Sequence, residues 1–365
     1  MTLAQTFSIA EIISAIEPCQ DRCKVEAQQR LDSLTKPIGS LGRLETIAGQ
    51  AYSIYSGQMP RPLRKAVYVF AADHGVTEEG VSAYPREVTA QMVLNFLKGG
   101  AAVNVLARLH KADLTVVDVG VDYEFEDAPG LRRMKVRRGS RNMHREAAMS
   151  HEELGQAFET GARLAQEAKE KGQHIIAIGE MGIGNTTAAS AITAALTGAS
   201  IGTVTGRGAG LDDVGRNRKL HVVKRSIKRH FGASTSNPEP LEILRCVGGL
   251  EIAAMTGFIF RAAATHMAIV CDGFISTAAA AIAYALAPRI ADYMFAGHCS
   301  EEPGHRHLLR YIGIKPILSL GMRLGEGTGA VLAMPVIESA LHLYAEMATF
   351  SSAGVSAAGP RESEQ

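Results

Sequence analysis

The sequence predicts an α/β fold in which helices cover both faces of a mostly parallel sheet. With 365 residues, 46% of them apolar and 21% charged, the chain is long enough to bury a sizeable core. Short, continuous apolar runs rich in β-branched residues are typical of strands that are buried on both faces. These runs alternate with longer helix-like stretches, which indicates strand–helix–strand units.

Six apolar runs predict the strands, and acidic residues follow most of them. Ligands in open α/β sheets bind beyond the carboxyl ends of the strands, so we expect these acids to share one cleft. The predicted strands are 65–72, 112–117, 174–178, 266–270, 293–296 and 317–320, and the acids are Asp73, Glu180, Asp272 and Glu326, with Asp118 a fifth candidate.

Helical patterns occupy the stretches between the strands and both ends of the chain. Residues 1–60 and 330–350 are expected to pack together as a small helical subdomain, and 61–329 to form an α/β catalytic domain. The tail 351–365 is rich in small and polar residues, so we expect it to be disordered. The helices predicted between strands are 88–109, 152–171, 187–196 and 276–285.

The charge balance argues against a protein that coats nucleic acid or an anionic membrane. Lys plus Arg is 38 and Asp plus Glu is 37, which leaves a formal charge of +1. The stretch 132–145 holds seven Lys and Arg residues, but acidic residues precede it and no aromatic side chains interleave with the basic ones. We therefore predict no nucleic-acid partner.

Cysteine usage and the apolar stretches favour a soluble, cytoplasmic protein. The five cysteines are too few and too scattered for a disulfide framework. Cys19 and Cys23 share one helix face, where ordinary packing is favoured over a regulatory or metal-binding pair. Glu11 and Glu17 interrupt the first apolar segment, so no signal peptide is predicted. An acid also interrupts the longest apolar stretch, 267–287, which argues against a membrane span.

Two glycine-rich loops suggest a phosphate site. The segment 179–187, Gly-Glu-Met-Gly-Ile-Gly-Asn-Thr-Thr, ends a strand and starts a helix, and exposed N–H groups at a helix start bind anions. It lacks the lysine of a Walker loop and the spacing of a dinucleotide fingerprint, so an ordinary turn remains the alternative. A second loop, 206–213, leads into a basic helix; its charges form a solvated face, although one could reach a phosphate.

A third glycine loop, 323–327, places Glu326 between two glycines. Glycines allow a ligand to approach closely, and apolar surroundings would raise the pKa of the carboxyl towards that of a useful base. The alternative is a glutamate that caps the following helix. By contrast, the His- and Cys-containing stretch 298–307 lacks the paired spacing of zinc ligands and resembles a helix start, so we predict no metal there.

Taken together, the motifs resemble those of the nicotinate-nucleotide–dimethylbenzimidazole phosphoribosyltransferases. Any one motif would be weak, but six in order are specific, and the resemblance runs from about residue 8 to residue 350. The motifs are Leu-Asp-Ser-Leu-Thr-Lys-Pro-Ile-Gly-Ser-Leu-Gly-Arg-Leu-Glu (31–45), Ala-Asp-His-Gly-Val (72–76), Gly-Val-Ser-Ala-Tyr-Pro (80–85), the loop 179–187, Asp-Gly-Phe (272–274) and Arg-Leu-Gly-Glu-Gly (323–327).

The resemblance implies a reaction and a fold. Nicotinate mononucleotide would give its 5-phosphoribosyl group to 5,6-dimethylbenzimidazole, producing α-ribazole 5′-phosphate and nicotinate with inversion at C1′. Enzymes of this family need no metal or organic cofactor and work as homodimers. Their fold is a six-stranded, mostly parallel Rossmann-like sheet with a small helical domain built from both chain ends.

The resemblance also assigns site residues. Glu326 falls on the general base, Glu180 on a second carboxylate and Asp272 on a further acid near the ribose. The phosphate and ribose residues would be Gly182, Gly184, Asn185, Thr186, Lys219 and Arg323, and the wall of the benzimidazole pocket Ser82, Tyr84 and Gln91.

Two other interpretations stay open. A related transferase could use another lower-ligand base, such as adenine or a phenolic compound. The second interpretation is a non-catalytic nucleotide-binding protein of the same fold, although a protein that only binds nucleotide has no need for Glu326 and Glu180. A diphosphate-using phosphoribosyltransferase is set aside, because no acidic loop followed by Thr-Gly-Gly comes after a β-branched strand.

Overall fold

The computed structural model describes residues 9–232 and 238–356. The chain divides into two compact units. The larger unit holds the residues up to Pro18 and Pro62–Met334, and the smaller holds Cys19–Arg61 and the residues from Pro335 onwards.

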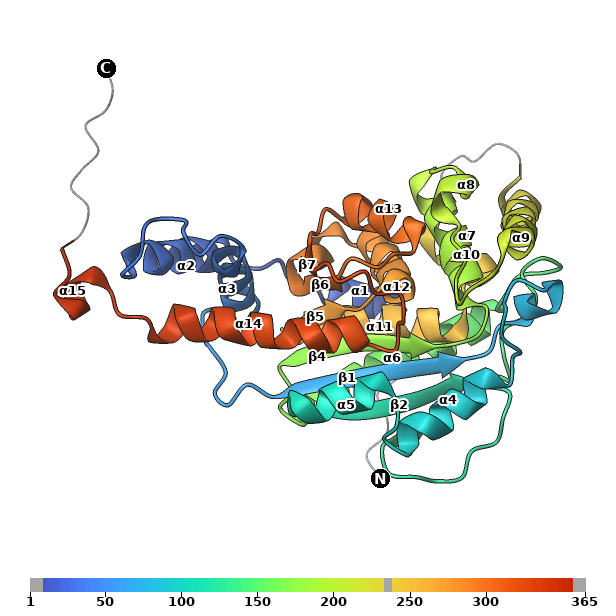
Figure 1. Ribbon diagram of the computed structural model, residues 1–365, viewed down its shortest axis with the longest axis horizontal. Coiled ribbons are helices and arrows are strands. Elements are labelled where there is room, and N and C mark those ends of the chain that lie inside the picture. Colours follow the sequence, from blue (N-terminus) through green and yellow to red (C-terminus); the bar gives the residue numbers. More distant parts are fainter. Residues whose placement is uncertain (1–8, 233–237, 357–365) are drawn as a thin grey trace, which may run out of the picture. The chain divides into compact units, whose positions relative to one another are not determined.

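A seven-stranded parallel sheet forms the centre of the larger unit, which confirms the predicted class (Figure 1). Its order is β3-β2-β1-β4-β5-β6-β7, so the direction of strand addition reverses between β1 and β4. In sheets of this type that reversal opens a ligand-binding crevice. The strands are β1 Lys65–Ala72, β2 Ala112–Gly120, β3 Leu131–Arg133, β4 Ile175–Met181, β5 Ala268–Cys271, β6 Met294–His298 and β7 Pro316–Leu318.

The described part of the chain has seven strands where the sequence predicts six, and the additional strand is β3. This strand is only three residues long, Leu131–Arg133, and pairs with β2 at the edge of the sheet. Two of its residues are arginines, so it carries no apolar run. Short, charged edge strands of this kind protect a sheet from pairing with other chains.

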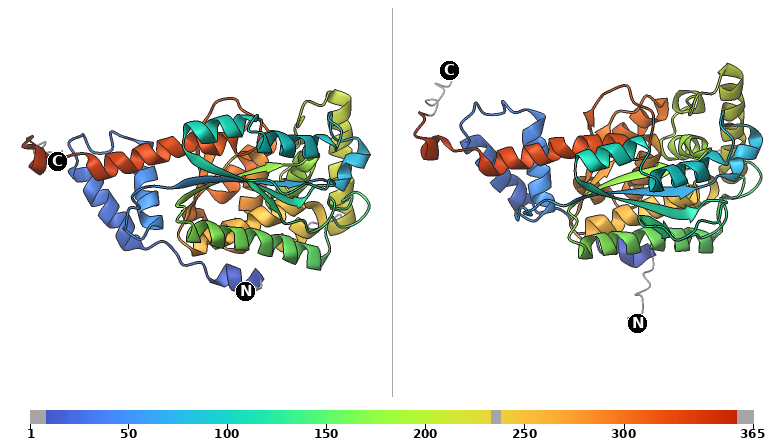
Figure 2. Two further views of the ribbon diagram at one scale, coloured as in Figure 1. Left: turned by 90° about the horizontal axis from the view of Figure 1, so that it is seen from below. Right: turned by 60° about the horizontal axis from the view of Figure 1, so that its bottom comes forward.

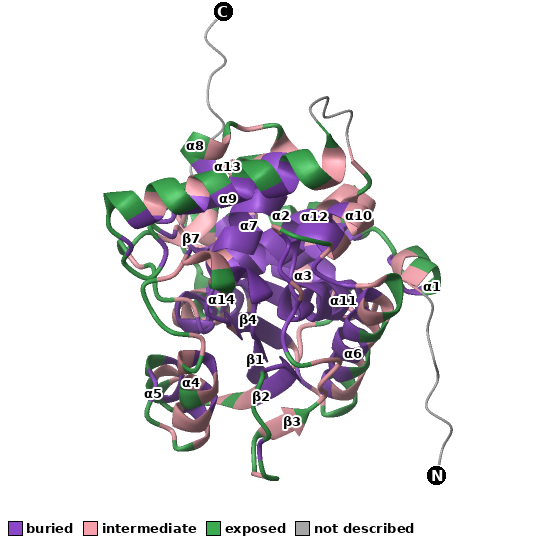
Figure 3. Cartoon of the chain, turned by 90° about the vertical axis from the view of Figure 1, so that its right-hand side faces the viewer, coloured by how far each residue is buried: buried purple, intermediate pink, exposed green. Residues whose placement is uncertain are grey.

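Helices cover both faces of the sheet, and the residues coloured as buried lie along its centre (Figures 2 and 3). Helices α6 and α11 lie on one face, with α4 and α5 on the other. A side chain at Gly161 or Gly257 would collide with the facing backbone of the α6–α11 pair, so glycine permits this close contact. The helices of this unit are α1 Ile9–Ser14, α4 Val88–Leu97, α5 Ala102–Leu109, α6 His151–Glu170, α7 Asn185–Thr197, α8 Ile201–Val204, α9 Asp213–Phe231, α10 Pro240–Val247, α11 Leu250–Ala264, α12 Phe274–Leu286, α13 Pro303–Ile312 and the start of α14 Thr328–Glu346, with 3-10 turns at Gly75–Glu79 and Pro288–Tyr293.

The helix predicted over 88–109 is two helices. Gly99 has φ +77°, a left-handed conformation that ends α4 before α5 begins. By length and composition alone, Val88–Leu109 and Thr328–Glu346 could each cross a membrane. Core helices of soluble proteins pass the same test, and this break interrupts the first segment.

The smaller unit contains α2 Asp21–Ser33, α3 Arg43–Ile54, the rest of α14 and α15 Phe350–Ala353. Both chain ends contribute to it: Arg30 donates hydrogen bonds to the backbone oxygens of Tyr344 and Met347, at 3.4 and 2.9 Å. Between α2 and α3, the buried Lys36 Nζ lies 2.8 Å from Glu45 Oε1. Cys19 and Cys23 are buried and form no disulfide, and Cys23 lies inside α2.

The boundaries of the two units differ from the expected domain boundaries at both ends of the chain. Helix α1 belongs to the larger unit, where it contacts α6 and α11 and where Tyr293 donates a 2.7 Å hydrogen bond to the backbone oxygen of Glu17. The tail expected to be disordered from residue 351 begins inside α15, where the Thr349 side chain caps the helix by accepting a hydrogen bond from the N–H of Ser352. The rest of that predicted tail, 357–365, lies outside the described residues.

Candidate active site

Three of the predicted carboxylates come together at the carboxyl ends of the strands. Glu180 is at the end of β4, Asp272 directly follows β5, and Glu326 precedes α14. A β-carbon on Gly325 would lie 2.6 Å from Glu180 Oε1, and Asp272 Oδ2 accepts a 3.2 Å hydrogen bond from the N–H of Gly327. All three acidic residues are at most 7% exposed.

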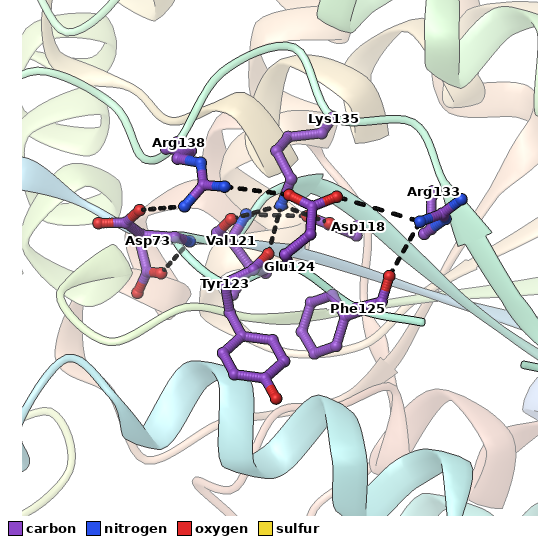
Figure 4. Close-up of polar contacts among 10 residues, drawn as sticks. Asp73, Asp118, Val121, Tyr123, Glu124, Phe125, Arg133, Lys135 and Arg138 are labelled. Carbon is purple, nitrogen blue, oxygen red and sulfur yellow. Dashed lines mark hydrogen bonds and ion pairs between the residues drawn. The ribbon is translucent and has the colours of Figure 1, made fainter. Parts of the chain in front are cut away.

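The other two predicted acids, Asp73 and Asp118, accept hydrogen bonds from the segment that follows β2. Asp118 accepts hydrogen bonds from Lys135 Nζ at 2.7 Å and from the N–H of Val121 at 2.8 Å, and Lys135 also donates to two backbone oxygens of the same loop (Figure 4). Asp73 accepts a 2.7 Å hydrogen bond from the N–H of Asp122. These bonds fix the segment that follows β2.

Glu326 occupies a strained turn. Its φ is +66°, between Gly325 at +87° and Gly327 at +85°. A left-handed conformation costs a residue other than glycine about 1–2 kcal/mol, and such strain gathers at functional sites. The turn lies directly on β4, because any side chain at Gly179 would collide with the backbone of Glu326 and Gly327.

The surroundings of Glu326 and Glu180 raise the pKa of each carboxyl by different combinations of burial and neighbouring charge. Burial, together with the negative charge of Asp272, raises the pKa of Glu326 to about 7. Burial and the charges of Glu251, Asp272 and Glu326 raise the pKa of Glu180 well above its usual value, although Asn185 Nδ2 donates a hydrogen bond to Glu180 Oε2. Glu326 is therefore set to exchange a proton near neutral pH, whereas Glu180 favours its protonated form.

A buried pair that the sequence did not suggest lies beside this cluster. His74 Nε2 is 2.7 Å from Glu251 Oε1, and the two side chains are 1% and 0% exposed. A β-carbon on Gly182 would lie 3.4 Å from the His74 ring, so the pair supports the glycine loop. The one sequence signal was the Asp-His-Gly that follows β1.

The glycine loop has the geometry of an anion site. Gly184 has φ +99° and immediately precedes helix α7, so the first N–H groups of a 13-residue helix meet the loop. Lys219, on α9, donates a 2.8 Å hydrogen bond from Nζ to Thr186 Oγ1. Lys219 is fully buried, and burial lowers its pKa to about 8. Arg323 donates a 3.3 Å hydrogen bond to the backbone oxygen of Gly208 in the neighbouring loop.

Of the three residues expected at a benzimidazole pocket, Gln91 lines a hollow. This hollow of about 310 Å³ lies between α4 and the segment after β2. Ser82 and Tyr84 are not among its lining residues; Ser82 Oγ accepts a 3.2 Å hydrogen bond from the N–H of Tyr84, whose side chain is exposed. The other lining residues are Asp73, Arg86, Glu87, Ala90, Leu94, Asp122 and Tyr123.

The stretch 298–307 contributes two histidines to the core. His298 and His305 are buried on β6 and α13, and His305 contacts Thr277 Oγ1 at 3.0 Å. Among residues 9–232 and 238–356, no group of three or more His, Cys, Asp or Glu side chains is arranged to hold a metal ion.

Comparison with known proteins identifies the family. A family model described as phosphoribosyltransferase matches residues 16–355. A nicotinate-nucleotide–dimethylbenzimidazole phosphoribosyltransferase of Geobacter metallireducens is 50% identical over 348 residues, which cover 95% of this chain and 98% of the relative. The chain belongs to the nicotinate-nucleotide–dimethylbenzimidazole phosphoribosyltransferase family. This confirms the resemblance drawn from the motifs.

Other members of the phosphoribosyltransferase family match to a similar extent. The enzyme of that name from Chlorobaculum parvum is 49% identical over 347 residues, covering 95% of this chain and 97% of its own length. The crystal structure of CobT from Thermus thermophilus superposes with a TM-score of 0.88 at 46% identity, covering 92% of this chain and all of that one. The family likeness therefore includes sequence and fold.

Proposed function

We propose that this protein transfers the 5-phosphoribosyl group of nicotinate mononucleotide to 5,6-dimethylbenzimidazole, giving α-ribazole 5′-phosphate and nicotinate with inversion at C1′. The observation that carries the proposal is Glu326, a buried carboxyl with a pKa of about 7, next to Glu180. Glu180 accepts a hydrogen bond from Asn185, which begins helix α7 directly after the glycine loop. The proposed proton acceptor and the proposed phosphate site would thus lie at one edge of the sheet.

The chemistry requires one proton acceptor. The bond from C1′ to the nicotinate nitrogen breaks, and nicotinate leaves from a cationic pyridinium without needing an acid. One benzimidazole nitrogen forms the new bond to C1′, and the N–H on the other nitrogen loses its proton to the Glu326 carboxylate. A base with a pKa near the working pH suits this step. Holding both substrates in line supplies much of the remaining rate.

The loop 182–186 would hold the phosphate. Its N–H groups and the α7 N-terminus provide fixed donors, and the Lys219 charge lies behind Thr186. Glu180 would provide the second carboxyl group of the site. Gln91 would contribute to the wall of the base pocket from α4.

The deciding experiment offers the purified protein nicotinate mononucleotide with a panel of bases and identifies products by mass. We expect α-ribazole 5′-phosphate with 5,6-dimethylbenzimidazole. A preference for adenine or phenolic acceptors would move the assignment to a related transferase, and tight nucleotide binding with no product would favour a non-catalytic binder.

We also propose a cytoplasmic homodimer. The absence of a disulfide among the five cysteines, all of which lie in the described residues, fits a reducing compartment. Light scattering coupled to size-exclusion chromatography should give twice the chain mass of 38.8 kDa. A monomer that retains full activity would contradict this assembly.

Replacing Lys219 with Met should weaken nucleotide binding about tenfold or more, since hydrogen bonds of charged groups contribute about 1.5–3 kcal/mol. Because the pKa of Lys219 is lowered to about 8, its charge is present below that pH and lost above it. The wild-type KM for nicotinate mononucleotide should therefore rise above pH 8, and the K219M profile should lack this rise. Lys224→Met, at an exposed position of the same helix, is the matched control. Equal nucleotide affinity in K219M and the control would exclude Lys219 from phosphate binding.

Exhaustive chelation should leave turnover unchanged, because the proposed chemistry uses a carboxylate base alone. The measurement is the initial rate before and after dialysis against a strong chelator. A loss of rate that added magnesium or zinc restores would show the expectation to be wrong.

A further inference from the structure

Asp272 uses both carboxylate oxygens to hold the turn that carries Glu326. Oδ2 accepts a 3.2 Å hydrogen bond from the N–H of Gly327, and Oδ1 accepts a 2.9 Å hydrogen bond from the N–H of Ala330. Asp272 is 2% exposed. Its oxygens are therefore directed at the backbone of the turn and of helix α14.

The turn needs such support, because three consecutive residues have left-handed conformations and the central one, Glu326, is not glycine. The first N–H groups of α14 also lack partners within their own helix, and an anion beside them is favourable. The Asp272 carboxylate thus joins the end of β5 to the start of α14 and holds the turn that carries Glu326.

His298 lies against this carboxylate. Its Nε2 is 3.8 Å from Asp272 Oδ1, and the side chains are 1% and 2% exposed. A β-carbon on Gly273 would lie 3.3 Å from the same nitrogen, and one on Gly329 would collide with the ring. The imidazole therefore fills a slot between the segment after β5 and the first turn of α14.

His305 closes the other side of the slot, with its ring centroid 6.2 Å from that of His298. Burial lowers the pKa of His305 to about 3, so it is neutral. Its Nδ1 accepts a 2.9 Å hydrogen bond from the N–H of Ser300, which leaves Nε2 to donate to Thr277 Oγ1 at 3.0 Å. His305 is thereby fixed in one orientation, and His298 rests against it.

We propose that Asp272 and His298 are positioning residues for the base: Asp272 holds the turn 325–327 so that Glu326 faces the substrate, and His298 holds Asp272. The proposal rests on the proposed function, in which Glu326 takes the benzimidazole proton. It gives a positioning role to Asp272, which the family resemblance places near the ribose.

The pair also affects the proton affinity of the base. Among the described residues, the charged or titratable groups that interact with Asp272 are Glu180 on β4, Cys271 on β5, Glu326 on the turn and His298 on β6. The Asp272 charge raises the pKa of Glu326, while His298 and the backbone N–H groups oppose the rise that burial causes in the pKa of Asp272. Removing the Asp272 charge should therefore lower the pKa of Glu326.

The first test is Asp272→Asn. We expect kcat to fall roughly 10- to 100-fold, the effect of a misplaced reacting group, while KM for nicotinate mononucleotide changes less than about threefold. The acid limb of the kcat–pH profile should move to lower pH. An altered stability with kcat and the limb unmoved would show that Asp272 is merely structural and would overturn the proposal.

The second test asks whether His298 acts through Asp272. His298→Gln should lower kcat less than Asp272→Asn, and the double variant should be no slower than Asp272→Asn alone, because a positioning residue adds nothing once its target is gone. Losses that multiply in the double variant would overturn this link. His221→Gln, an exposed histidine on α9, controls for the substitution itself.

Two further measurements keep the outcomes separate. If Asp272→Asn does not fold, His298→Ala and His298→Gln are compared: recovery of kcat by Gln supports the positioning role, and equal rates in both variants and the wild type overturn it. Glu326→Gln is assayed in parallel. Wild-type turnover in Glu326→Gln contradicts the proposed base, whereas a strongly reduced kcat in Glu326→Gln beside an unaffected Asp272→Asn enzyme contradicts this inference alone.

Discussion

Replacing Glu326 with Gln should lower kcat by roughly 10²-fold or more, the range expected when a positioned general base is lost. Gln is nearly isosteric with Glu, so both substrates should still bind and their KM values should change little. The base must be ionised to act, so wild-type activity should rise with pH through about 7, the pKa to which burial and Asp272 raise Glu326. In the variant this limb should flatten. Steady-state rates from acidic to mildly alkaline pH provide the test.

Glu170→Gln, at an exposed position in the last turn of α6, is the matched control and should match the wild type. Residual activity in Glu326→Gln would point to proton transfer through water to Glu180, and the remaining limb would then report the pKa of that acid. Wild-type turnover with an unchanged pH profile would assign Glu326 a structural role.

The sheet could be predicted where burial dictates the residue types. Strand β1 was placed at 65–72 because all eight of its residues are buried and an apolar run is the result. Strand β3 could not be predicted in this way, because an edge strand of three residues that contains two arginines has no apolar run. The break at Gly99 had a visible cause in two consecutive glycines, but a continuous apolar pattern on either side concealed it.

The carboxylate cluster could be predicted because parallel strands bring their carboxyl ends to one edge of the sheet. That rule places Glu180 and Asp272 together without any knowledge of side-chain direction. It does not distinguish a side chain that faces a ligand from one that holds the backbone: Asp118 and Asp272 both accept hydrogen bonds from backbone N–H groups, whereas Asp73 lines the hollow beside Gln91. The His74–Glu251 pair was missed because its members are 177 positions apart and Glu251 lies within an apolar helix. Such a contact is set by packing and leaves no periodic pattern.

Replacing Gly184 should have the second large effect, on nucleotide affinity. The residue has φ +99°, and a β-carbon there would lie 2.8 Å from Thr77 Cγ2 and 3.2 Å from His74 Cβ. Ala must therefore push the loop away from the 3-10 turn Gly75–Glu79, and Val must push it further. The displaced N–H groups would no longer converge on a phosphate. Because hydrogen bonds to a charged group contribute about 1.5–3 kcal/mol, loss of one corresponds to roughly 10- to 100-fold in affinity.

Calorimetry with nicotinate mononucleotide alone separates this effect from catalysis, and circular dichroism establishes that each variant is folded. Gly198→Ala is the matched control: that glycine ends the same helix α7 with φ +66°, and a β-carbon there meets nothing within 4 Å. It should carry a similar cost in backbone strain while leaving nucleotide affinity unchanged. Affinity should fall in the order wild type, Gly184→Ala, Gly184→Val. Wild-type affinity in a folded Gly184→Val protein would place the phosphate elsewhere, because no loop with that side chain could keep the geometry observed here.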